Sequence, residues 1–467
     1  MRQSLARELN DLLERSRDRQ LRLAVTGLSR SGKTAFLTSL VHQLRHAGLE
    51  ARLDLLPAAR EGRLLGAKRV AQQDLGVPRF PYDQALAALD ATPPRWPEPT
   101  RGISELRLSI RYRPAGRPLF RGDTATLTLD LFDYPGEWLL DLPLLGHDYL
   151  SWSLAQPLSS ATDLNHERRA LFADWLDGVE SLDPAADADE EQLAEIAALY
   201  AQGLRNAREA GFSNLQPGRF LLPGDLEGAP VLQFFPLPEL SESERTALET
   251  LPEESVYRTL VRRFVHYQQH IVKPFYRNHF RRFDRQIVLV DVLSALNAGP
   301  ERFEDLSQAL ATLMQSFAYG KRSLLSRLFS PRIDRLAIAA TKADHVTPEQ
   351  HANLVALLEA LLADPLQDLR FADIPVKAMS LASIRATETR EVEHQGKRTP
   401  ALRGTTLDGE EVLVFPGEVP ARLPDTAFWA RQGFDFRDFR PAPRDNGGLP
   451  HIRLDAALDW LLGDKLQ

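Results

Sequence analysis

One stretch near the start of the chain constrains the fold more than any other. Residues 21–34 read LRLAVTGLSRSGKT, an apolar run followed by a Gly-bounded loop and then by Lys and Thr. This order matches the phosphate-binding pattern G-x-x-x-x-G-K-[ST], in which a buried strand leads into the loop and a helix follows it. The alternative is a chance Gly-rich turn before a helix, but four fixed positions in this context rarely coincide by chance. We therefore predict a strand, an anion-binding loop and a helix in direct succession.

The residue types in this loop fit a bound triphosphate. Gly27 and Gly32 let the chain curl so that successive backbone N–H groups point inward, and the positive end of the following helix adds to the attraction. Lys33 can reach the outer phosphates, and the hydroxyl of Thr34 is a hard oxygen ligand suited to Mg²⁺. The predicted phosphate-binding residues are Gly27, Ser29, Arg30, Ser31, Gly32, Lys33, Thr34 and Ala35.

A second motif follows an alternating, strand-like stretch. Residues 125–138 read ATLTLDLFDYPGEW, and Asp133 to Gly136 form a DxxG at the end of the predicted strand. In nucleotide hydrolases the Asp at this place holds Mg²⁺ through water, and the Gly amide senses the γ-phosphate. We therefore predict that Asp133 belongs to a metal site and that Gly136 responds to the bound nucleotide.

Further apolar runs alternate with helical patterns along the chain. Residues 285–299, 335–344 and 373–383 each contain a run that suits a strand buried on both faces. This alternation predicts an α/β fold with a doubly wound, mostly parallel sheet and a ligand at its carboxyl edge. The candidate motifs all lie at the carboxyl ends of predicted strands, so we expect them to converge on one site.

The patterns also predict a domain organisation. Residues 1–138 and 285–385 are expected to form the phosphate-loop domain. Residues 139–284 carry Leu and Ala at helical spacing and predict a helical insertion. Residues 386–467 contain alternating strands with a hairpin turn at Asp408-Gly409, and then a short closing helix, which predicts a small β-rich appendage packed on the main domain.

Two further stretches stand out by their composition. Residues 63–100 are rich in Arg, Pro and small residues, and this composition indicates a poor core and a mobile segment. Residues 257–283 mix Arg, His and aromatics. The aromatics recur at helical spacing, so a long amphipathic helix with solvated arginines is favoured over a nucleic-acid or phospholipid contact.

Composition limits the classes of function. The formal net charge of −7 gives no general attraction to nucleic acid, and the chain has no Cys, which excludes thiol catalysis and Cys-ligated zinc. The first residues are charged and lack an apolar signal core, and no apolar run approaches the ~18–20 residues needed to cross a bilayer. These features predict a cytoplasmic protein, with attachment to a membrane surface still open.

The motif TKAD at the end of a predicted strand distinguishes guanine from adenine. The Asp344 carboxylate can accept two hydrogen bonds from N1–H and the exocyclic amine of guanine, whereas adenine presents an acceptor at N1. Lys342 can lay its stem along the base plane, and Thr341 precedes it. The sequence thus favours GTP over ATP, and an ATP-dependent protein in which TKAD is a turn remains the alternative.

The chain resembles the Ras-like GTPases in GLSRSGKT, DYPG and TKAD, and over nearly its full length it is similar to the YcjX-like family of bacterial P-loop proteins. The narrower resemblance rests on four stretches, WPEPTRGISELRLSIRYRP, DYPGEWLLDLPLL, VDVLSALNAG and TKADHVTP. It implies a cytoplasmic, stress-linked GTPase with a helical insertion. Genes of this family often neighbour one for an inner-membrane protein, which leaves such a protein, or the membrane surface, as a candidate partner. The resemblance does not imply the physiological target.

The resemblance assigns further residues by position. Thr100 matches the threonine that closes on Mg²⁺ and the γ-phosphate, and Ala382 and Ser383 lie where the last base-contacting motif is expected. Glu137 stands where Ras-like proteins usually carry Gln to orient the attacking water. A carboxylate there can act as a base, but it also repels phosphate and can be an inert salt-bridge partner, which predicts slow intrinsic turnover.

Taken together, the sequence predicts a Mg²⁺-dependent, GTP-hydrolysing switch. The residues expected to act in hydrolysis are Lys33, Thr100, Gly136 and Glu137, and those expected at the metal are Thr34, Thr100 and Asp133. An arginine supplied in cis has three candidates, Arg30, Arg95 and Arg101, although at each position an ordinary surface arginine is the more common case. A nucleotide-regulated interaction protein with negligible hydrolysis is a further alternative. The sequence indicates no oligomeric state.

Overall fold

The structure is a computed structural model. It describes residues 20–28, 30–47, 52–99, 102–115, 123–156, 158, 166–237, 242–318, 333–371, 373–394, 397–431, 434–444 and 448–467. The predictions made for Ser29, Thr100 and Arg101 therefore lie outside the described residues.

The chain divides into two compact units. The sheet unit comprises Met1–Pro135, Phe283–Asn297 and Arg332–Gln467, and the helical unit comprises Gly136–Arg282 and Ala298–Pro331. The first boundary falls between Pro135 and Gly136, inside the DYPG motif.

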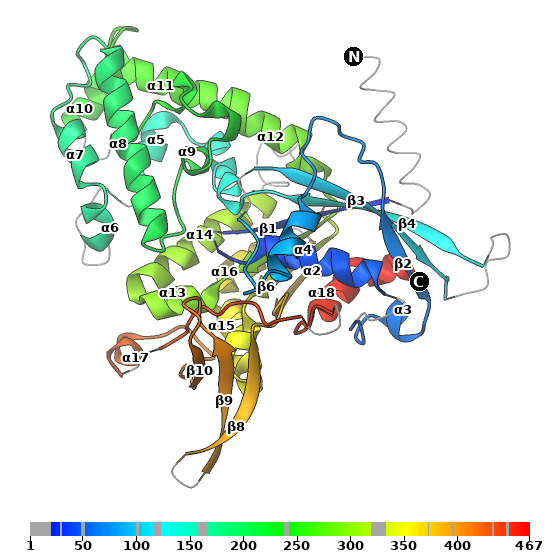
Figure 1. Ribbon diagram of the computed structural model, residues 1–467. Helices are drawn as coiled ribbons and strands as arrows, with labels where there is room; N and C mark the ends of the chain where they lie inside the picture. The colour runs from blue at the N-terminus through cyan, green and yellow to red at the C-terminus, as the bar shows by residue number, and fades with distance from the viewer. Residues whose placement is uncertain are drawn as a thin grey trace. The chain divides into compact units, whose positions relative to one another are not determined.

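A seven-stranded sheet forms the centre of the sheet unit (Figure 1). Its strand order is β2-β3-β4-β1-β5-β6-β7. β3 is antiparallel to β2 and β4, and the other neighbouring pairs are parallel. The strands span Gln20–Gly27 (β1), Leu64–Arg69 (β2), Ser104–Tyr112 (β3), Ala125–Asp133 (β4), Arg285–Val290 (β5), Arg335–Ala340 (β6) and Val376–Ser380 (β7). The prediction of an α/β fold with a mostly parallel sheet is confirmed.

Burial on both faces explains the continuous apolar runs in the central strands. Every residue of β5 is buried, and in β1 and β6 only the first residue is partly exposed. Parallel strands covered on both sides read as near-continuous hydrophobic sequence. Because these strands run in the same direction, the segments that follow them meet at one edge of the sheet.

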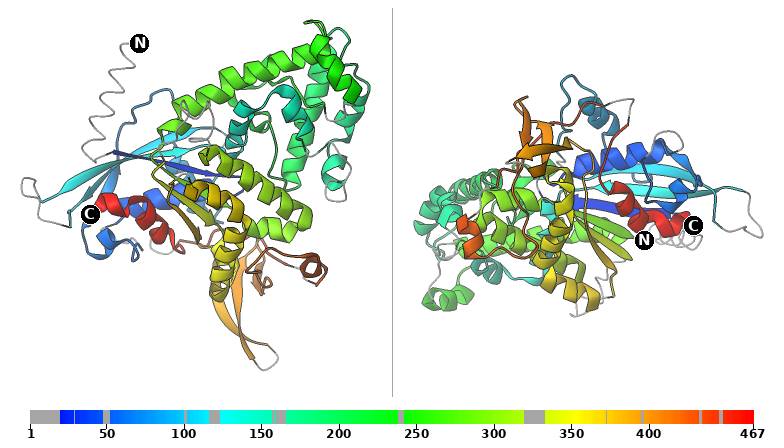
Figure 2. Two further views of the ribbon diagram at one scale, coloured as in Figure 1. Left: turned by 180° about the vertical axis from the view of Figure 1, so that it is seen from behind. Right: turned by 90° about the horizontal axis from the view of Figure 1, so that it is seen from below.

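Helices on the sheet complete this core. α2 (Lys33–Arg45) and α18 (Leu454–Leu462) contribute buried Leu, Val and Phe side chains to the same apolar cluster as the strands. Figure 2 shows α18, coloured red, lying beside the strands in both views. The other helices of this unit include α3 (Pro57–Arg60), α4 (Tyr82–Leu89), α13 (Val292–Ala298), α15 (His351–Leu361), α16 (Ala363–Phe371) and α17 (Thr426–Arg431).

The stretch from residue 63 to 100, predicted to be a poor core and a mobile segment, contains β2 and α4, which the sequence analysis did not predict. β2 is a half-exposed edge strand, so its sequence lacks a strong apolar pattern. In α4 only three side chains are buried, Tyr82, Ala85 and Leu89. Tyr82 and Phe80, which precedes α4, nevertheless reach the main core.

The helical unit, drawn mainly in green in Figure 1, is packed around aromatic side chains. Trp152 stacks on Phe264 at 5.1 Å between ring centroids, and Phe234 lies edge-on to both. Its principal helices are α5 (Tyr149–Leu154), α7 (Ala173–Glu180), α8 (Glu190–Glu209), α11 (Val256–Tyr267), α12 (Lys273–Asn278) and α14 (Pro300–Ala318). The aromatics of residues 257–283 are largely buried, as a packed amphipathic helix requires.

A separate three-stranded antiparallel sheet follows β7. It consists of β8 (Thr387–His394), β9 (Lys397–Thr405) and β10 (Glu411–Val414), in the order β10-β9-β8. β9 and β10 are joined by a tight turn in which Gly409 has φ 96°, a value that favours glycine. The predicted small β-rich extension is thereby confirmed.

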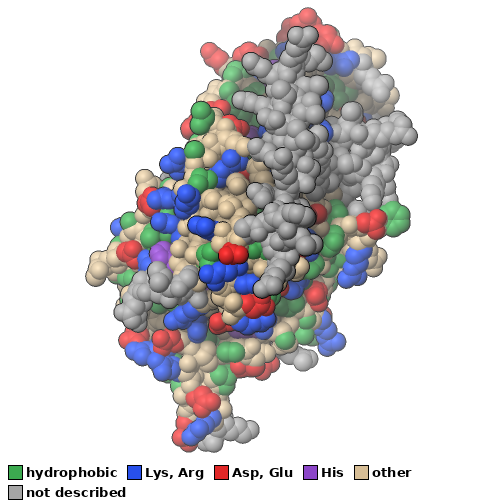
Figure 3. Space-filling view, turned by 90° about the vertical axis from the view of Figure 1, so that its right-hand side faces the viewer, with side chains coloured by type: hydrophobic (Ala, Val, Ile, Leu, Met, Phe, Trp, Pro, Cys, Tyr) green, Lys and Arg blue, Asp and Glu red, His purple; other side chains and the backbone are tan. Residues whose placement is uncertain are grey.

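The surface is mixed in charge. On the face shown in Figure 3, Lys and Arg side chains are interspersed with Asp and Glu. Among the described residues, no helix combines the length and the apolarity that a bilayer crossing requires.

Candidate nucleotide site

The loop between β1 and α2 has the geometry of an anion-binding turn. Gly32 precedes α2 with φ 83°, and Arg30 has φ 60°, so both lie in the left-handed region. Gly27 has no room for a side chain, since an added Cβ would overlap with Ser31 Oγ and the carbonyl oxygen of Leu289. The loop therefore folds tightly against β5 before the helix begins.

Two side chains of this loop, those of Lys33 and Ser31, are buried. Lys33 is buried, and its ammonium donates hydrogen bonds to the carbonyl oxygens of Gly27 at 2.6 Å and Leu28 at 3.3 Å. The Ser31 hydroxyl is buried too, and it has no hydrogen-bond partner within the described residues. A buried, unpartnered donor is costly in a folded protein unless a ligand or water satisfies it. Both observations fit a loop that takes an anion.

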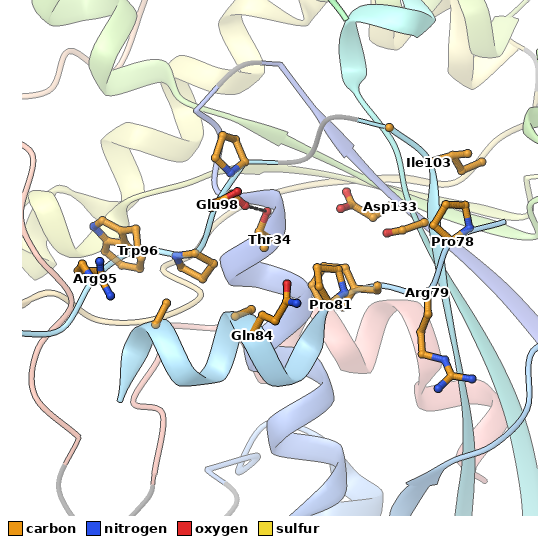
Figure 4. Close-up of a pocket in the computed structure, with 17 residues that line it drawn as sticks. Thr34, Pro78, Arg79, Pro81, Gln84, Arg95, Trp96, Glu98, Ile103 and Asp133 are labelled. Carbon is orange, nitrogen blue, oxygen red and sulfur yellow. Dashed lines mark hydrogen bonds between the residues drawn. The ribbon is translucent and has the colours of Figure 1, made fainter. Parts of the chain in front are cut away.

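Hard oxygen donors lie beside the loop. Thr34 and Asp133 line one pocket of about 570 Å³, shown in Figure 4. The Thr34 hydroxyl donates a hydrogen bond to the carbonyl oxygen of Glu98 at 3.2 Å, and Asp133 is buried at the end of β4. A hydroxyl and a carboxylate are ligands that Mg²⁺ accepts, and Mg²⁺ usually takes its remaining ligands from water and phosphate. This donor set fits the predicted metal site.

The other wall of this pocket comes from the chain before β3. Residues 95–99 and 102–104 line it, and Arg95 is exposed there. Because β3 is antiparallel to β4, its first residue, Ser104, pairs with Asp133 at the carboxyl edge of the sheet. The described residues 102–104 thus enter the sheet at this edge.

The TKAD motif follows β6 with a fixed conformation. Lys342 has φ 56°, and the backbone N–H of Ala343 donates to Leu381 O at 3.1 Å. Asp344 is buried, and its Oδ2 accepts a hydrogen bond from the backbone N–H of Ala386 at 2.7 Å. This bond fixes the orientation of the carboxylate.

Lys342 lies between two carboxylates. Its ammonium is 2.8 Å from Asp291 Oδ2 and 3.0 Å from Asp438 Oδ1. Burial alone would lower the pKa of Lys342, but the two carboxylates outweigh it and raise the pKa above its ordinary value. Burial would likewise raise the pKa of Asp291, but Lys342 and hydrogen bonds from Ser294 hold it below its usual range. Lys342 and Asp291 are therefore both charged at neutral pH.

One pocket of about 470 Å³ joins the phosphate loop to the TKAD motif. The predicted residues that line it are Arg30, Ser31, Gly32, Lys33, Thr34, Ala35, Thr341, Lys342, Asp344, Ala382 and Ser383. Gly27 is not in the lining, although its carbonyl oxygen holds Lys33. Asp133 lines the neighbouring pocket, and the two pockets share Thr34.

Gly136 and Glu137 belong to the helical unit, where they begin a short 3₁₀ helix, Gly136–Leu139. Glu137 is buried, and Arg208 lies 3.7 Å from its Oε1. Gly218 packs directly on the Glu137 carbonyl, too closely for any side chain. The pairing with Arg208 is the kind of contact that the salt-bridge alternative for Glu137 predicts.

Several residues in or beside the pocket were not predicted. Asp291 does not line the pocket but pairs with Lys342, which does. It directly follows β5, so the rule that ligands bind at strand ends could have indicated it. Trp96, Leu407, Asp438 and Phe439 line the pocket. Asp438 lies 96 residues after Lys342 in a segment without regular structure, and no local pattern marks it.

The chain is similar to known proteins over almost its whole length. Residues 21–466 match the model of the YcjX-like family, DUF463. A protein named Ras-like GTPase YcjX from Escherichia coli (strain K12) is 53% identical over 467 residues, covering 99% of each chain. A protein of the same name from Shewanella oneidensis (strain MR-1) is 44% identical over 480 residues, covering 99% of this chain and 98% of that relative.

Proposed function

The chain belongs to the YcjX-like family, and from that premise we propose that it is a Mg²⁺-dependent GTPase that acts as a nucleotide-controlled switch. The observation that carries the proposal is the single pocket that contains both the phosphate loop and the TKAD motif. Two relatives are named Ras-like GTPases, which supports the same choice of nucleotide.

The phosphates would lie on the loop between β1 and α2. Backbone N–H groups from Gly27 to Ala35 and the amino end of α2 would bind their oxygens, and Lys33 would leave its carbonyl partners to contact the outer phosphates. Thr34 would bind Mg²⁺ directly and Asp133 through water, with Thr100 joining them when GTP is present. The metal would offset the charge of the phosphates during hydrolysis.

The base would lie against TKAD. Asp344 would accept hydrogen bonds from the guanine N1–H and amine, and Lys342 would lie along the ring. Ala382 and Ser383, which follow β7, would contact the same base from the next strand. The fixed orientation of the Asp344 carboxylate supports this assignment, because discrimination between bases requires a preorganised acceptor.

Turnover is proposed to be slow. The buried position of Glu137 and its ion pair with Arg208 leave little freedom for it to orient a water molecule. Intrinsic hydrolysis in Ras-like GTPases without an arginine finger already takes minutes or longer, and a poorly placed water-orienting group would slow it further. Gly136 would contact the γ-phosphate and begin the conformational response to hydrolysis.

Binding of fluorescent GDP and ADP in the presence of Mg²⁺ tests the proposal. We expect the wild type to prefer GDP by tenfold or more, and the Asp344→Asn variant to shift its preference toward a xanthine nucleotide. Equal binding, or a preference for ADP, would instead support an ATP-dependent protein. Phosphate release from GTP that disappears in Lys33→Ala would exclude an interaction protein without hydrolysis.

A further inference from the structure

A segment near the end of the chain forms one wall of the candidate nucleotide pocket. We call residues 436–440, together with Leu407, the C-terminal wall. Leu407, Asp438 and Phe439 line the same pocket as the phosphate loop and TKAD. None of the sequence motifs described above includes these residues.

The C-terminal wall is anchored in the fold. Phe439 is only 2% exposed, and its ring packs edge-on against His345 at 5.1 Å between centroids. The backbone N–H of Arg440 donates to Thr405 O at 2.8 Å, which attaches the wall to the end of β9. Gly404 lies so close to Phe439 that an added Cβ would be 2.6 Å from its ring. The wall therefore has a defined position beside TKAD.

A second attachment comes from the chain before β3. Trp96 donates a hydrogen bond from its indole N–H to the carbonyl oxygen of Phe439 at 2.7 Å. Trp96 also lines both pockets, beside the loop on one side and beside Thr34 and Asp133 on the other. The wall is thus held from two directions, by β9 and by Trp96.

Asp438, in the C-terminal wall, forms an ion pair with Lys342 of the TKAD motif. Lys342 lies between Asp291, which is 7% exposed, and Asp438, which is 52% exposed. Asp291 is fixed by hydrogen bonds to the backbone and hydroxyl of Ser294 at the start of α13. With Asp291 alone, the ammonium would be drawn toward α13. Asp438 supplies a second anchor from the C-terminal wall.

We propose that Asp438 is a positioning residue for the nucleotide base: by pairing with Lys342 it holds the lysine stem where a guanine ring would lie against it. The C-terminal extension is then part of the nucleotide site. This inference rests on the proposed function, since it concerns the same pocket and the same ligand.

The proposal predicts losses of GDP affinity that differ in size among three variants of Asp438. A half-exposed ion pair contributes little, so Asp438→Asn should raise the Kd for fluorescent GDP about two- to fivefold. Asp438→Lys places a like charge beside Lys342 and should raise it about tenfold or more, with a smaller effect at high salt. Asp438→Glu, which keeps the charge, should restore most of the affinity.

Two controls separate positioning from a loss of structure. Asp435→Lys makes the same charge change in the same segment, at an exposed residue paired with Arg437, and should leave the Kd unchanged. Tripolyphosphate with Mg²⁺, measured by calorimetry, contacts only the phosphate loop and should bind all variants equally. If the substitutions at Asp438 merely detached the C-terminal wall from the fold, the thermal stability of the variants would change. In that case Asp438→Glu would not restore the affinity for GDP.

The failures are distinguishable. If the wild type prefers GDP and Asp344→Asn shifts that preference, but Asp438→Lys and Asp438→Asn bind GDP as Asp435→Lys does, the positioning role is wrong and the proposed function stands. If the variants lose tripolyphosphate and GDP binding equally, Asp438 is structural and the positioning role is again wrong. If the wild type shows no preference for GDP, both proposals fall together.

Discussion

Gly27 ends β1 at a point where no side chain fits. An added Cβ would overlap with Leu289 O, a backbone atom of β5 that cannot move without disturbing the sheet. We therefore expect Gly27→Ala to lower the free energy of unfolding by about 1–3 kcal/mol, as overpacked positions do, and to abolish GDP binding. Urea unfolding checks the first effect. Gly448→Ala is the matched control, because a Cβ there meets nothing within 4 Å.

Glu105 predicts a pH dependence of stability. It is buried on β3, and burial, with a smaller contribution from Asp130, raises its pKa to about 7 although Arg107 acts in the opposite direction. Because the folded state binds this proton more tightly than the unfolded state, its contribution to stability is complete below about pH 4.5 and is lost as pH rises to about 7.

Replacement of Glu105 by Gln should remove this dependence. We expect Glu105→Gln to flatten the stability profile between about pH 4.5 and 7 and to be more stable than the wild type above pH 7 by about 1–2 kcal/mol, a value reduced for solvent screening. Unfolding by urea at a series of pH values measures it. The exposed Glu418→Gln is the control, and a parallel profile for Glu105→Gln and wild type would contradict the prediction.

At the scale of single residues, sequence reasoning identified the residues that lie in short motifs. Gly27, Lys33 and Asp344 could be predicted because the geometry of a loop or turn fixes their spacing locally. Asp438 and Trp96 reach the pocket only through tertiary packing. Whether these two residues lie in the pocket depends on how segments that are distant in the chain pack together, and a single sequence does not indicate that packing.

At the scale of whole elements, the apolar central strands were the most predictable. β1, β5 and β6 are buried on both faces, so their sequences are continuous and distinctive. β2 and α4 were missed because an edge strand and a short surface helix bury few side chains. The pairing of a strand at the edge is decided by its neighbour rather than by its own pattern.

The last helical turn is tied to the sheet by a buried arginine. Arg285, at the start of β5, is 1% exposed and donates to both carboxylate oxygens of Asp464, at 2.5 and 2.6 Å, and to Asp334 at 2.9 Å. Burial alone would raise the pKa of Asp464, but Arg285 outweighs it and lowers the pKa. This contact makes the C-terminus part of the sheet unit.

Removing the charge of either carboxylate that pairs with Arg285 should therefore lower the free energy of unfolding, and the effect should be larger for the more buried carboxylate. Removing one member of a buried pair leaves the other charge uncompensated. We expect Asp464→Asn to lower the free energy of unfolding by about 2–3 kcal/mol and Asp334→Asn, whose side chain is 49% exposed, by about 1 kcal/mol or less. Thermal and urea unfolding of both variants test the order, and equal losses would contradict it.

At the scale of the whole molecule, the boundary between the two units divides the DYPG motif. Asp133 belongs to the sheet unit and Gly136 to the helical unit. If Gly136 contacts the γ-phosphate as proposed, GTP makes a contact at this residue that GDP, which lacks the γ-phosphate, cannot make. Differential contact is what a ligand needs to shift a conformational equilibrium.

Hydrogen exchange followed by mass spectrometry measures the protection of backbone amides in both units in one experiment. GDP at about a hundred times its Kd should slow exchange in the strands of the sheet unit by up to about a hundredfold, because it binds only the folded state. A non-hydrolysable GTP analogue should do the same and should also slow exchange in Gly136–Leu139. Lys33→Ala, unable to hold either nucleotide, should show neither effect. An identical pattern with the two nucleotides would mean that the helical unit does not sense the γ-phosphate, and the switch would have to be abandoned even if GTP hydrolysis were retained.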